Sequence, residues 1–175
     1  GIPDTLAAVE QGLRELRDCG VHAIGEITAS NSALEALKST ALEVVSFREF
    51  IGLDAQFIEQ HLEAAESHIR QLQAESGKCR VKPGLSPHAP YTVHPELFRA
   101  LIDLARQSNV PVAMHLAETK EELELLESGS GPFREFLSAM GLWDSQVFPG
   151  GRRIMPFLQQ LATTTSGLVV HGNYL

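Results

Sequence analysis

VPVAMHLAET, residues 110–119, begins as an apolar run and ends in side chains that can do chemistry. The apolar residues lead into His115, and Glu118 follows shortly after it. A short continuous apolar run is typical of a parallel strand that is buried on both faces. In parallel α/β folds, the carboxyl ends of the strands carry the functional side chains. The stretch therefore predicts a parallel sheet with His115 and Glu118 at its functional edge.

Helical and strand-like patterns alternate on both sides of this stretch. The expected strands are residues 21–28, 42–47, 79–86, 110–115 and 166–171. The expected helices are residues 4–18, 31–39, 54–76, 94–109, 119–128, 132–140 and 154–163. Strands separated by helices form right-handed βαβ units and a parallel sheet. Two α/β architectures satisfy this order, a doubly wound sheet and part of a (β/α)8 barrel, and the absence of repeats or linkers indicates one domain over residues 1–175.

The composition is that of an ordinary globular protein and argues against two classes of partner. Of the 175 residues, 43% are hydrophobic and 21% are charged, which is enough apolar material for one good-sized core. The net charge of −8, without any cluster of lysine and arginine, argues against nucleic acid as a partner. No run approaches the roughly 20 apolar residues of a membrane span, which argues against a membrane. Cys19 and Cys79 form no CxxC pair, so we expect reduced thiols and a cytoplasmic location.

Each expected strand has polar residues at or just beyond its end, and three of the seven histidines lie within two residues of a strand end. In strand order these polar residues are Glu26, Thr28 and Asn31; Arg48 and Glu49; Ser86, His88 and Tyr91; His115 and Glu118; and His171 and Asn173. Imidazoles held rigidly at different strand ends can converge on one zinc, iron or nickel ion. A carboxylate beside such a ligand can take a proton from metal-activated water and hand it to a leaving group.

The histidines also have a purely structural interpretation. A single histidine at a strand end commonly serves as a hydrogen-bonding partner. His88 stands between Pro87 and Pro90 and is suited to brace a turn. Two histidines alone do not complete a zinc site, which takes three or four ligands.

The charged residues have structural interpretations as well. Glu118 suits the first turn of a helix, where the helix dipole favours negative charge. We expect a solvated helix face from its neighbours Glu121, Glu122 and Glu124. Arg48 and Glu49 can pair with each other, and Asn173 can brace the last loop.

The motifs GLSPHAPYTVHPEL, VPVAMHLAET and LVVHGNYL resemble, in order and spacing, those of the amidohydrolase superfamily. The most similar branch contains cytosine deaminase, guanine deaminase, S-adenosylhomocysteine deaminase and the triazine chlorohydrolases. The resemblance covers nearly the whole chain, and HLAE after an apolar strand is its most specific part. It implies a (β/α)8 TIM barrel, of which residues 1–175 form a segment from about strand 2 to strand 6, without the first and last strands.

The resemblance also implies a site and a reaction. His115 matches the metal ligand after strand 5, and His171 matches the one after strand 6. Glu118 matches the catalytic glutamate that shuttles the proton, and His88 matches a residue that lines the substrate pocket. The implied cofactor is one divalent metal, zinc before iron. The implied reaction is hydrolytic deamination of a small-molecule substrate, an amino-substituted heterocycle such as a nucleobase or nucleoside, by metal-bound hydroxide. Because this branch is often dimeric, a homodimer is an option.

The sequence departs from the family pattern, which leaves other functions open. It contains no HxH pair and no match to the last two strands with their metal-binding aspartate. We therefore expect a segment of a longer polypeptide that is inactive alone. Dechlorination or hydrolysis of a cyclic amide is the alternative activity on the same scaffold. Two alternatives belong to other classes of protein. One is a barrel remnant without catalysis. The other is a doubly wound binding domain, against which the absence of any GxGxxG or GxxxxGK loop argues.

Overall fold

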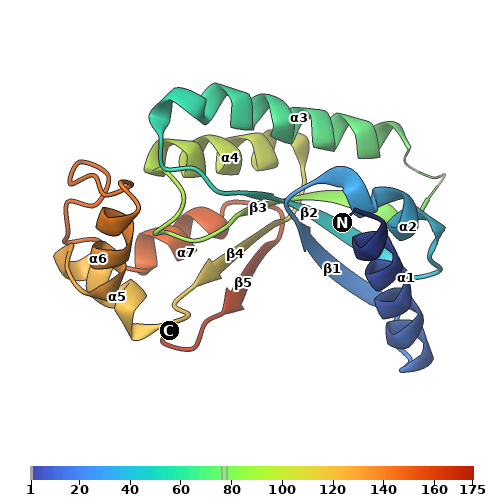
Figure 1. Cartoon of the computed structure of the whole chain (residues 1–175). Coiled ribbons are helices and arrows are strands. Elements are labelled where there is room, and N and C mark those ends of the chain that lie inside the picture. Colours follow the sequence, from blue (N-terminus) through green and yellow to red (C-terminus); the bar gives the residue numbers. More distant parts are fainter. Residues whose placement is uncertain (1, 76, 78) are drawn as a thin grey trace.

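The computed structural model describes residues 2–75, 77 and 79–175 and contains one parallel sheet. The strands are β1 (Ala23–Thr28), β2 (Glu43–Phe50), β3 (Val81–Pro87), β4 (Val112–Leu116) and β5 (Gly167–His171). Every neighbouring pair is parallel, and the order in the sheet follows the order in the sequence. A doubly wound sheet reverses its strand order at a switch point. That alternative is therefore wrong, and the predicted partial barrel is confirmed by the curled sheet in Figure 1.

The helices begin and end close to their predicted limits. They are α1 (Ile2–Asp18), α2 (Leu34–Ser39), α3 (Ile58–Ala74), α4 (Pro95–Ser108), α5 (Lys120–Ser128), α6 (Pro132–Ala139) and α7 (Met155–Leu161). The helix predicted over 54–76 begins later, because Asp54 caps a short 3-10 turn at Ala55–Phe57 by accepting the backbone N–H of Gln56. Its predicted last residue, Ser76, lies outside the described residues. None of the described helices is both long and apolar enough to cross a membrane.

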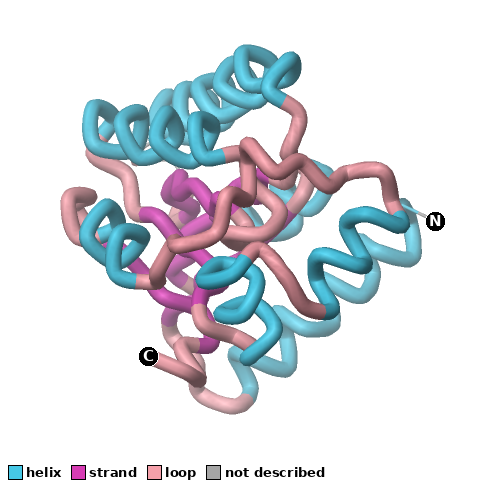
Figure 2. The backbone as a smooth tube through the Cα atoms, turned by 90° about the vertical axis from the view of Figure 1, so that its left-hand side faces the viewer, coloured by secondary structure: helices cyan, strands magenta, loops and turns pink. Residues whose placement is uncertain are grey.

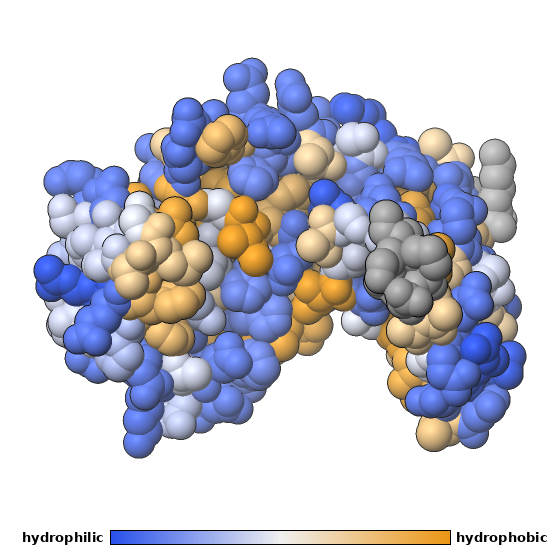
Figure 3. Space-filling model, viewed as in Figure 1, coloured by the Kyte–Doolittle hydropathy of each residue, from blue (hydrophilic) through white to orange (hydrophobic). Residues whose placement is uncertain are grey.

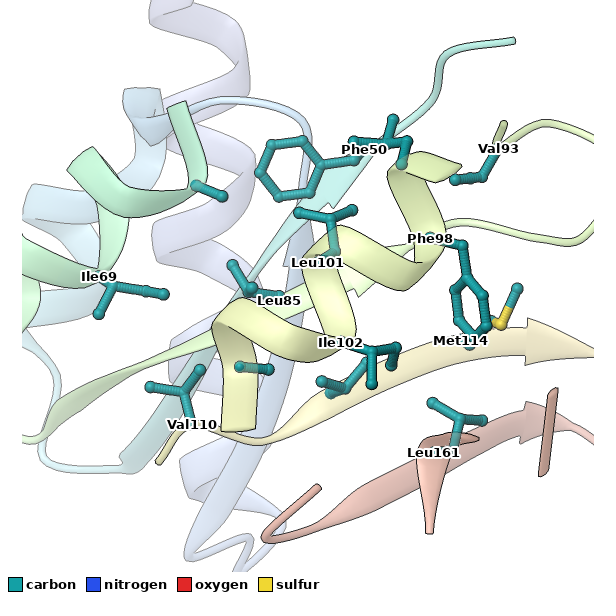
Figure 4. Close-up of a cluster of buried hydrophobic side chains, with 14 of the residues drawn as sticks. Phe50, Ile69, Leu85, Val93, Phe98, Leu101, Ile102, Val110, Met114 and Leu161 are labelled. Carbon is teal, nitrogen blue, oxygen red and sulfur yellow. The ribbon is translucent and has the colours of Figure 1, made fainter. Parts of the chain in front are cut away.

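The main core lies between the sheet and the helices α3 and α4, which run side by side over one face of it (Figure 1). Phe98, Leu101 and Ile102 of α4 pack against Leu85 and Met114 of the strands, and none of the five is more than 3% exposed (Figure 4). Burying one side chain of this size stabilises the fold by about 1.5–3 kcal/mol. In the view of Figure 2, the strands gather at the centre with helices around them. This core fixes which residues of each strand face the helices.

The opposite face of the sheet is concave and carries the alternate residues of each strand. Phe47 of β2 lies across this face, since a Cβ added to Gly84 of β3 would come 2.6 Å from its ring, and one added to Gly25 of β1 would come 3.0 Å from it. Close approach of the ring therefore explains a glycine inside each of these strands. Leu168 of β5, which pairs with Ala113 of β4, is 50% exposed. Figure 3 shows an indentation on this underside of the molecule, with apolar residues along it.

Strand β2 is longer than predicted. The sequence interpretation ended the strand at residue 47, but the pairing with β3 continues to Phe50, which lies opposite Pro87. Hydrogen bonding to a parallel neighbour outweighs the low strand preference of charged residues. Arg48 and Glu49 are therefore strand residues on opposite faces, and Glu49 shares the concave face with Phe47.

Candidate active site

His115 stands at the carboxyl end of β4 and points to the concave face. Val112, Met114 and Leu116 of the same strand belong to the core under the helices, so the alternation of the strand turns His115 away from it. Its backbone N–H donates to the carbonyl oxygen of His88 at 2.8 Å, and its Nδ1 lies 3.1 Å from the same oxygen. Because a carbonyl only accepts, Nδ1 carries the proton and Nε2 keeps a free lone pair. This is the tautomer that a metal-binding imidazole needs.

His88 follows β3 and lies beside His115, with 4.7 Å between the ring centres. Its Nδ1 is 2.7 Å from the hydroxyl of Thr92, which itself donates to the carbonyl oxygen of Ala89 at 3.3 Å. Nδ1 of His88 is therefore the donor, and its other ring nitrogen is free to accept. Burial lowers the pKa of His88 and the neighbouring His115 lowers it further, while Glu49 and Glu118 raise it. The net lowering favours a neutral ring, so His88 acts as a turn brace through Nδ1 and offers its other nitrogen to the site.

Glu49 completes a cluster with these two histidines. A carboxylate oxygen of Glu49 and one ring nitrogen each of His88 and His115 lie within 4.8 Å of one another, and all three residues are half-buried. No ion pair joins Arg48 to Glu49 among the described residues, so the expected pairing is wrong. The sequence interpretation singled out Glu49 as a strand-end residue but did not assign it to the site. The available signal was its spacing from Phe47, which places both on the concave face.

Glu118 and His171 meet at the far end of this edge. Oε1 of Glu118 lies 3.4 Å from Nε2 of His171, and the two side chains are 35% and 37% exposed. The ring of His171 lies 5.4 Å from that of His115. The backbone of His171 is left-handed, with φ of 70°, and strain of this kind costs about 1–3 kcal/mol and clusters at functional sites. Asn173 braces the loop as expected, because its Nδ2 donates to the carbonyl oxygen of Glu118 at 3.1 Å.

Glu122 holds the backbone that carries Glu118. Its carboxylate accepts the N–H of Ala117 and the N–H of Glu118, each at 2.9 Å, and its own N–H donates to the Thr119 hydroxyl at 3.2 Å. Ala117 is left-handed, with φ of 55°, so both N–H groups turn toward one carboxylate. Glu122 is 0% exposed, and the prediction that it belongs to a solvated face is wrong for this residue. The signal for its burial was the spacing of Thr119 and Glu122, which is that of a capping box.

Tyr91 and Phe133 form an aromatic wall next to the cluster. The ring of Tyr91 packs edge-on against His88 with 6.1 Å between ring centres, and Phe133 of α6 lies 4.5 Å from Tyr91. Burial raises the pKa of Tyr91, and the charges of Glu118 and Glu122 raise it further. The phenol therefore stays neutral and can donate a hydrogen bond toward the site.

Two histidines outside this cluster make hydrogen bonds within the fold. His94 caps α4, because its Nδ1 accepts the N–H of Glu96 at 3.2 Å. His68 is 2% exposed, and its Nε2 lies 2.9 Å from the carbonyl oxygen of Ser46. Both ring nitrogens of His68 have partners within the fold, since its Nδ1 lies 3.3 Å from Oδ1 of Asn31, and Nδ1 of His94 is likewise occupied.

The side chains of the cluster are of the types that bind a divalent metal. His88 and His115 each keep one ring nitrogen that can accept, and the carboxylate of Glu49 accepts as well, so the cluster offers lone pairs to a cation or to donor groups. Imidazole and carboxylate are common ligands of zinc and iron. His171 lies outside the 4.8 Å group, next to Glu118. The ligand pair of His115 and His171 remains a prediction.

Comparison with known proteins agrees with the fold and the motifs. The model of the amidohydrolase family matches residues 5–172. The chain therefore belongs to the amidohydrolase family.

Individual relatives narrow the class of reaction. The chain is 32% identical over 130 residues to an aminodeoxyfutalosine deaminase of Nitratiruptor, an alignment that covers 74% of this chain and 32% of the relative. It is 30% identical over 129 residues to an adenosine deaminase of Helicobacter pylori, with 74% of this chain and 31% of the relative covered. Both relatives are named as deaminases, and the chain spans about a third of the length of these curated relatives.

A solved structure has the same arrangement of strands and helices. The aminofutalosine deaminase of Helicobacter pylori, in complex with methylthio-coformycin, superposes with a TM-score of 0.69 at 29% identity. The superposition covers 75% of this chain and 32% of that protein. The chain thus resembles a part of that enzyme's fold.

Proposed function

We propose that the intact protein is a metal-dependent hydrolase that removes the amino group of an adenine-type nucleoside, with Glu118 as its proton carrier. One observation carries the proposal: Glu118 contacts His171 at 3.4 Å, at the same sheet edge as the cluster around His115. The family supports a hydrolase. The relatives named as deaminases of aminodeoxyfutalosine and adenosine support the substrate class.

The proposed cofactor is one divalent metal, zinc before iron, with His115 and His171 as ligands and further ligands from outside this segment. Support comes from the tautomer of His115, whose Nδ1 is committed to the carbonyl oxygen of His88. When bound, such a metal supplies a Lewis acid that makes water nucleophilic near neutral pH. The segment by itself is proposed to be inactive, because two imidazoles do not complete a zinc site.

In the proposed mechanism, the side chains of this chain bind, orient and move protons. Glu118 accepts a proton from the attacking water and delivers it to the ring nitrogen next to the carbon that bears the amino group. Water adds to that carbon, Glu118 carries the remaining hydroxyl proton to the amino group, and ammonia leaves as the C–N bond breaks and the carbonyl forms. The contact with His171 holds the carboxylate of Glu118 in reach. His88 and Glu49 offer acceptors to donor groups of the substrate.

The proposal also covers the cellular location, the oligomeric state and the domain organisation of the intact protein. Cys19 and Cys79 are both free thiols, which supports a cytoplasmic location. We propose a homodimer because the deaminase branch that the sequence resembles is often dimeric. One TIM-barrel domain is proposed for the intact protein, of which this chain forms the middle strands.

Ammonia release by the intact protein tests the reaction. Adenosine, 5′-deoxyadenosine and methylthioadenosine are the substrates, and a chlorotriazine and a cyclic amide test the alternative activities on the same scaffold. Glu118→Gln is expected to lower kcat by about 100-fold or more, the usual share of a general acid–base group, while metal content stays unchanged. Glu121→Gln is the matched control, since Glu121 is an exposed neighbour in the first turn of α5. Retained turnover in the Glu118 variant would remove Glu118 from its role, and elemental analysis of both proteins distinguishes zinc from iron.

A further inference from the structure

A cavity of about 530 Å³ lies between α4, α7 and the loop that precedes α7. Its size is within the range of small-molecule sites, which is roughly 300–1,000 Å³. Phe98 on α4 is part of its lining and also part of the core beneath the helices, so the cavity opens on the outer side of the sheet. The histidine cluster occupies the concave side. The cavity shares no residue with that cluster and is independent of the proposed deaminase site.

The floor of this cavity is aromatic. The rings of Phe98 and Phe157 lie 5.3 Å apart at an angle of 51°. Pro156 lines the cavity beside them, and Met155 is 57% exposed at its mouth. Exposed apolar surface next to aromatic rings favours a ligand with a flat apolar part.

Arginines surround the floor, although the protein as a whole carries a net charge of −8. Arg99, Arg152 and Arg153 all line the cavity. Arg99 reaches only Glu96, at 3.9 Å, and both side chains are more than 60% exposed, so this ion pair is weak. Neither Arg152 nor Arg153 comes within ion-pair distance of a carboxylate among the described residues, although Glu127 lines an adjoining hollow. The positive charge around the cavity is therefore largely uncompensated.

Arg152 is held in place by its backbone. Its N–H donates to the carbonyl oxygen of Leu126 at 2.9 Å, and the N–H of Gly151 donates to that of Glu127 at 2.7 Å. Gly150 is left-handed, with φ of 74°, and a Cβ there would come 3.2 Å from the backbone of Ser128. The loop is thus fastened to the end of α5 in a conformation that favours glycine. Burial lowers the pKa of Arg152, and the like charge of Arg99 lowers it further.

We propose that this cavity binds an aromatic compound carrying a phosphate or carboxylate, with its ring against Phe157 and Pro156 and its anionic group between Arg99 and Arg152. Guanidinium groups bind phosphate and carboxylate through paired N–H donors. An anion between the two arginines would replace their repulsion by attraction, and the ring would cover the exposed apolar side chains of Met155 and Pro156. The site lies on the outer side of the sheet, away from the proposed chemistry, so its ligand is distinct from the substrate.

Calorimetric titration of the intact protein tests this site with four probes. Phenyl phosphate and benzoate carry both features, inorganic phosphate lacks the ring, and phenol lacks the charge. We expect saturable binding of phenyl phosphate or benzoate, at least about tenfold tighter than that of inorganic phosphate or phenol. Arg152→Gln and Arg99→Gln are each expected to weaken it about tenfold, as the loss of a charge-assisted hydrogen bond does. Arg106→Gln is the matched control, because Arg106 is on α4 but outside the cavity and pairs with Asp103.

Several results would overturn the proposal. They are the absence of saturable binding by either aromatic anion, equal affinity for inorganic phosphate, and equal affinity in the Arg152, Arg99 and Arg106 variants. Melting curves of all three variants show that the comparison is made on folded protein. Sedimentation of the ligand-free protein tests a second copy as the occupant, and a dimer that the Arg152 variant dissociates would also overturn it.

Discussion

Replacing Glu122 by alanine is expected to destabilise the protein and to misplace Glu118. The carboxylate of Glu122 accepts two N–H groups at 2.9 Å each, and the residue is 0% exposed. A buried donor that loses its acceptor costs about 1–3 kcal/mol. The N–H of Ala117 is buried, so its loss of an acceptor destabilises by the full amount. The N–H of Glu118 belongs to a half-buried residue and can form a hydrogen bond to water instead, so its loss destabilises less. Burial raises the pKa of Glu122, so removal of a buried charge offsets another part. The net loss is expected to be about 2–3 kcal/mol.

The matched control for this experiment is Glu121→Ala. Glu121 is the preceding residue in α5, is exposed, and is expected to change the free energy of unfolding by less than about 0.5 kcal/mol. Denaturant unfolding of the intact protein measures both variants, and steady-state ammonia release measures kcat and KM. We expect kcat to fall with the Glu122 variant because the loop that carries Glu118 loses its anchor. Equal stability and equal kcat in the two variants would show that the carboxylate neither holds the loop nor positions Glu118.

Two further predictions concern the fold. Burial lowers the pKa of His68 below 6.5, so the unfolded chain binds a proton that the folded chain does not, and the free energy of unfolding is expected to fall as the pH drops below about 6.5. Unfolding curves between about pH 5 and 8 measure this, and a His68→Gln variant that keeps the same slope would contradict it. Gly84→Ala is expected to cost about 1–3 kcal/mol, because its Cβ would come 2.6 Å from the ring of Phe47. Gly12→Ala in α1 is expected to stabilise the protein by about 0.5–1 kcal/mol, because a Cβ there meets nothing within 4 Å. Melting curves compare the two variants, and a higher melting temperature for the Gly84 variant would refute the close approach of the Phe47 ring to Gly84.

The alternation of apolar runs and helical periodicity was enough to predict the strands of the described sheet and the location of His88, His115 and His171 at or just beyond the carboxyl ends of three strands. These features are local, because period and chain direction are properties of consecutive residues. The choice between the two α/β architectures could not be made from consecutive residues. It depended on the order in which the strands pair, which the structure shows to follow the sequence.

Two glutamates show what consecutive residues could not reveal. Glu49 was expected just beyond the end of a strand, where pairing with Arg48 was one interpretation. Instead, β2 continues along β3 and carries the carboxylate of Glu49 to within 4.8 Å of ring nitrogens of His88 and His115. Glu122 looked like part of a charged helix face, yet the left-handed turn at Ala117 aims two N–H groups at it and buries it. The sequence determines which residues are strands, helices and turns, because those preferences act between near neighbours. Which side chains meet depends on the pairing and curl of the whole sheet, since that is set by burial and backbone hydrogen bonds between distant segments.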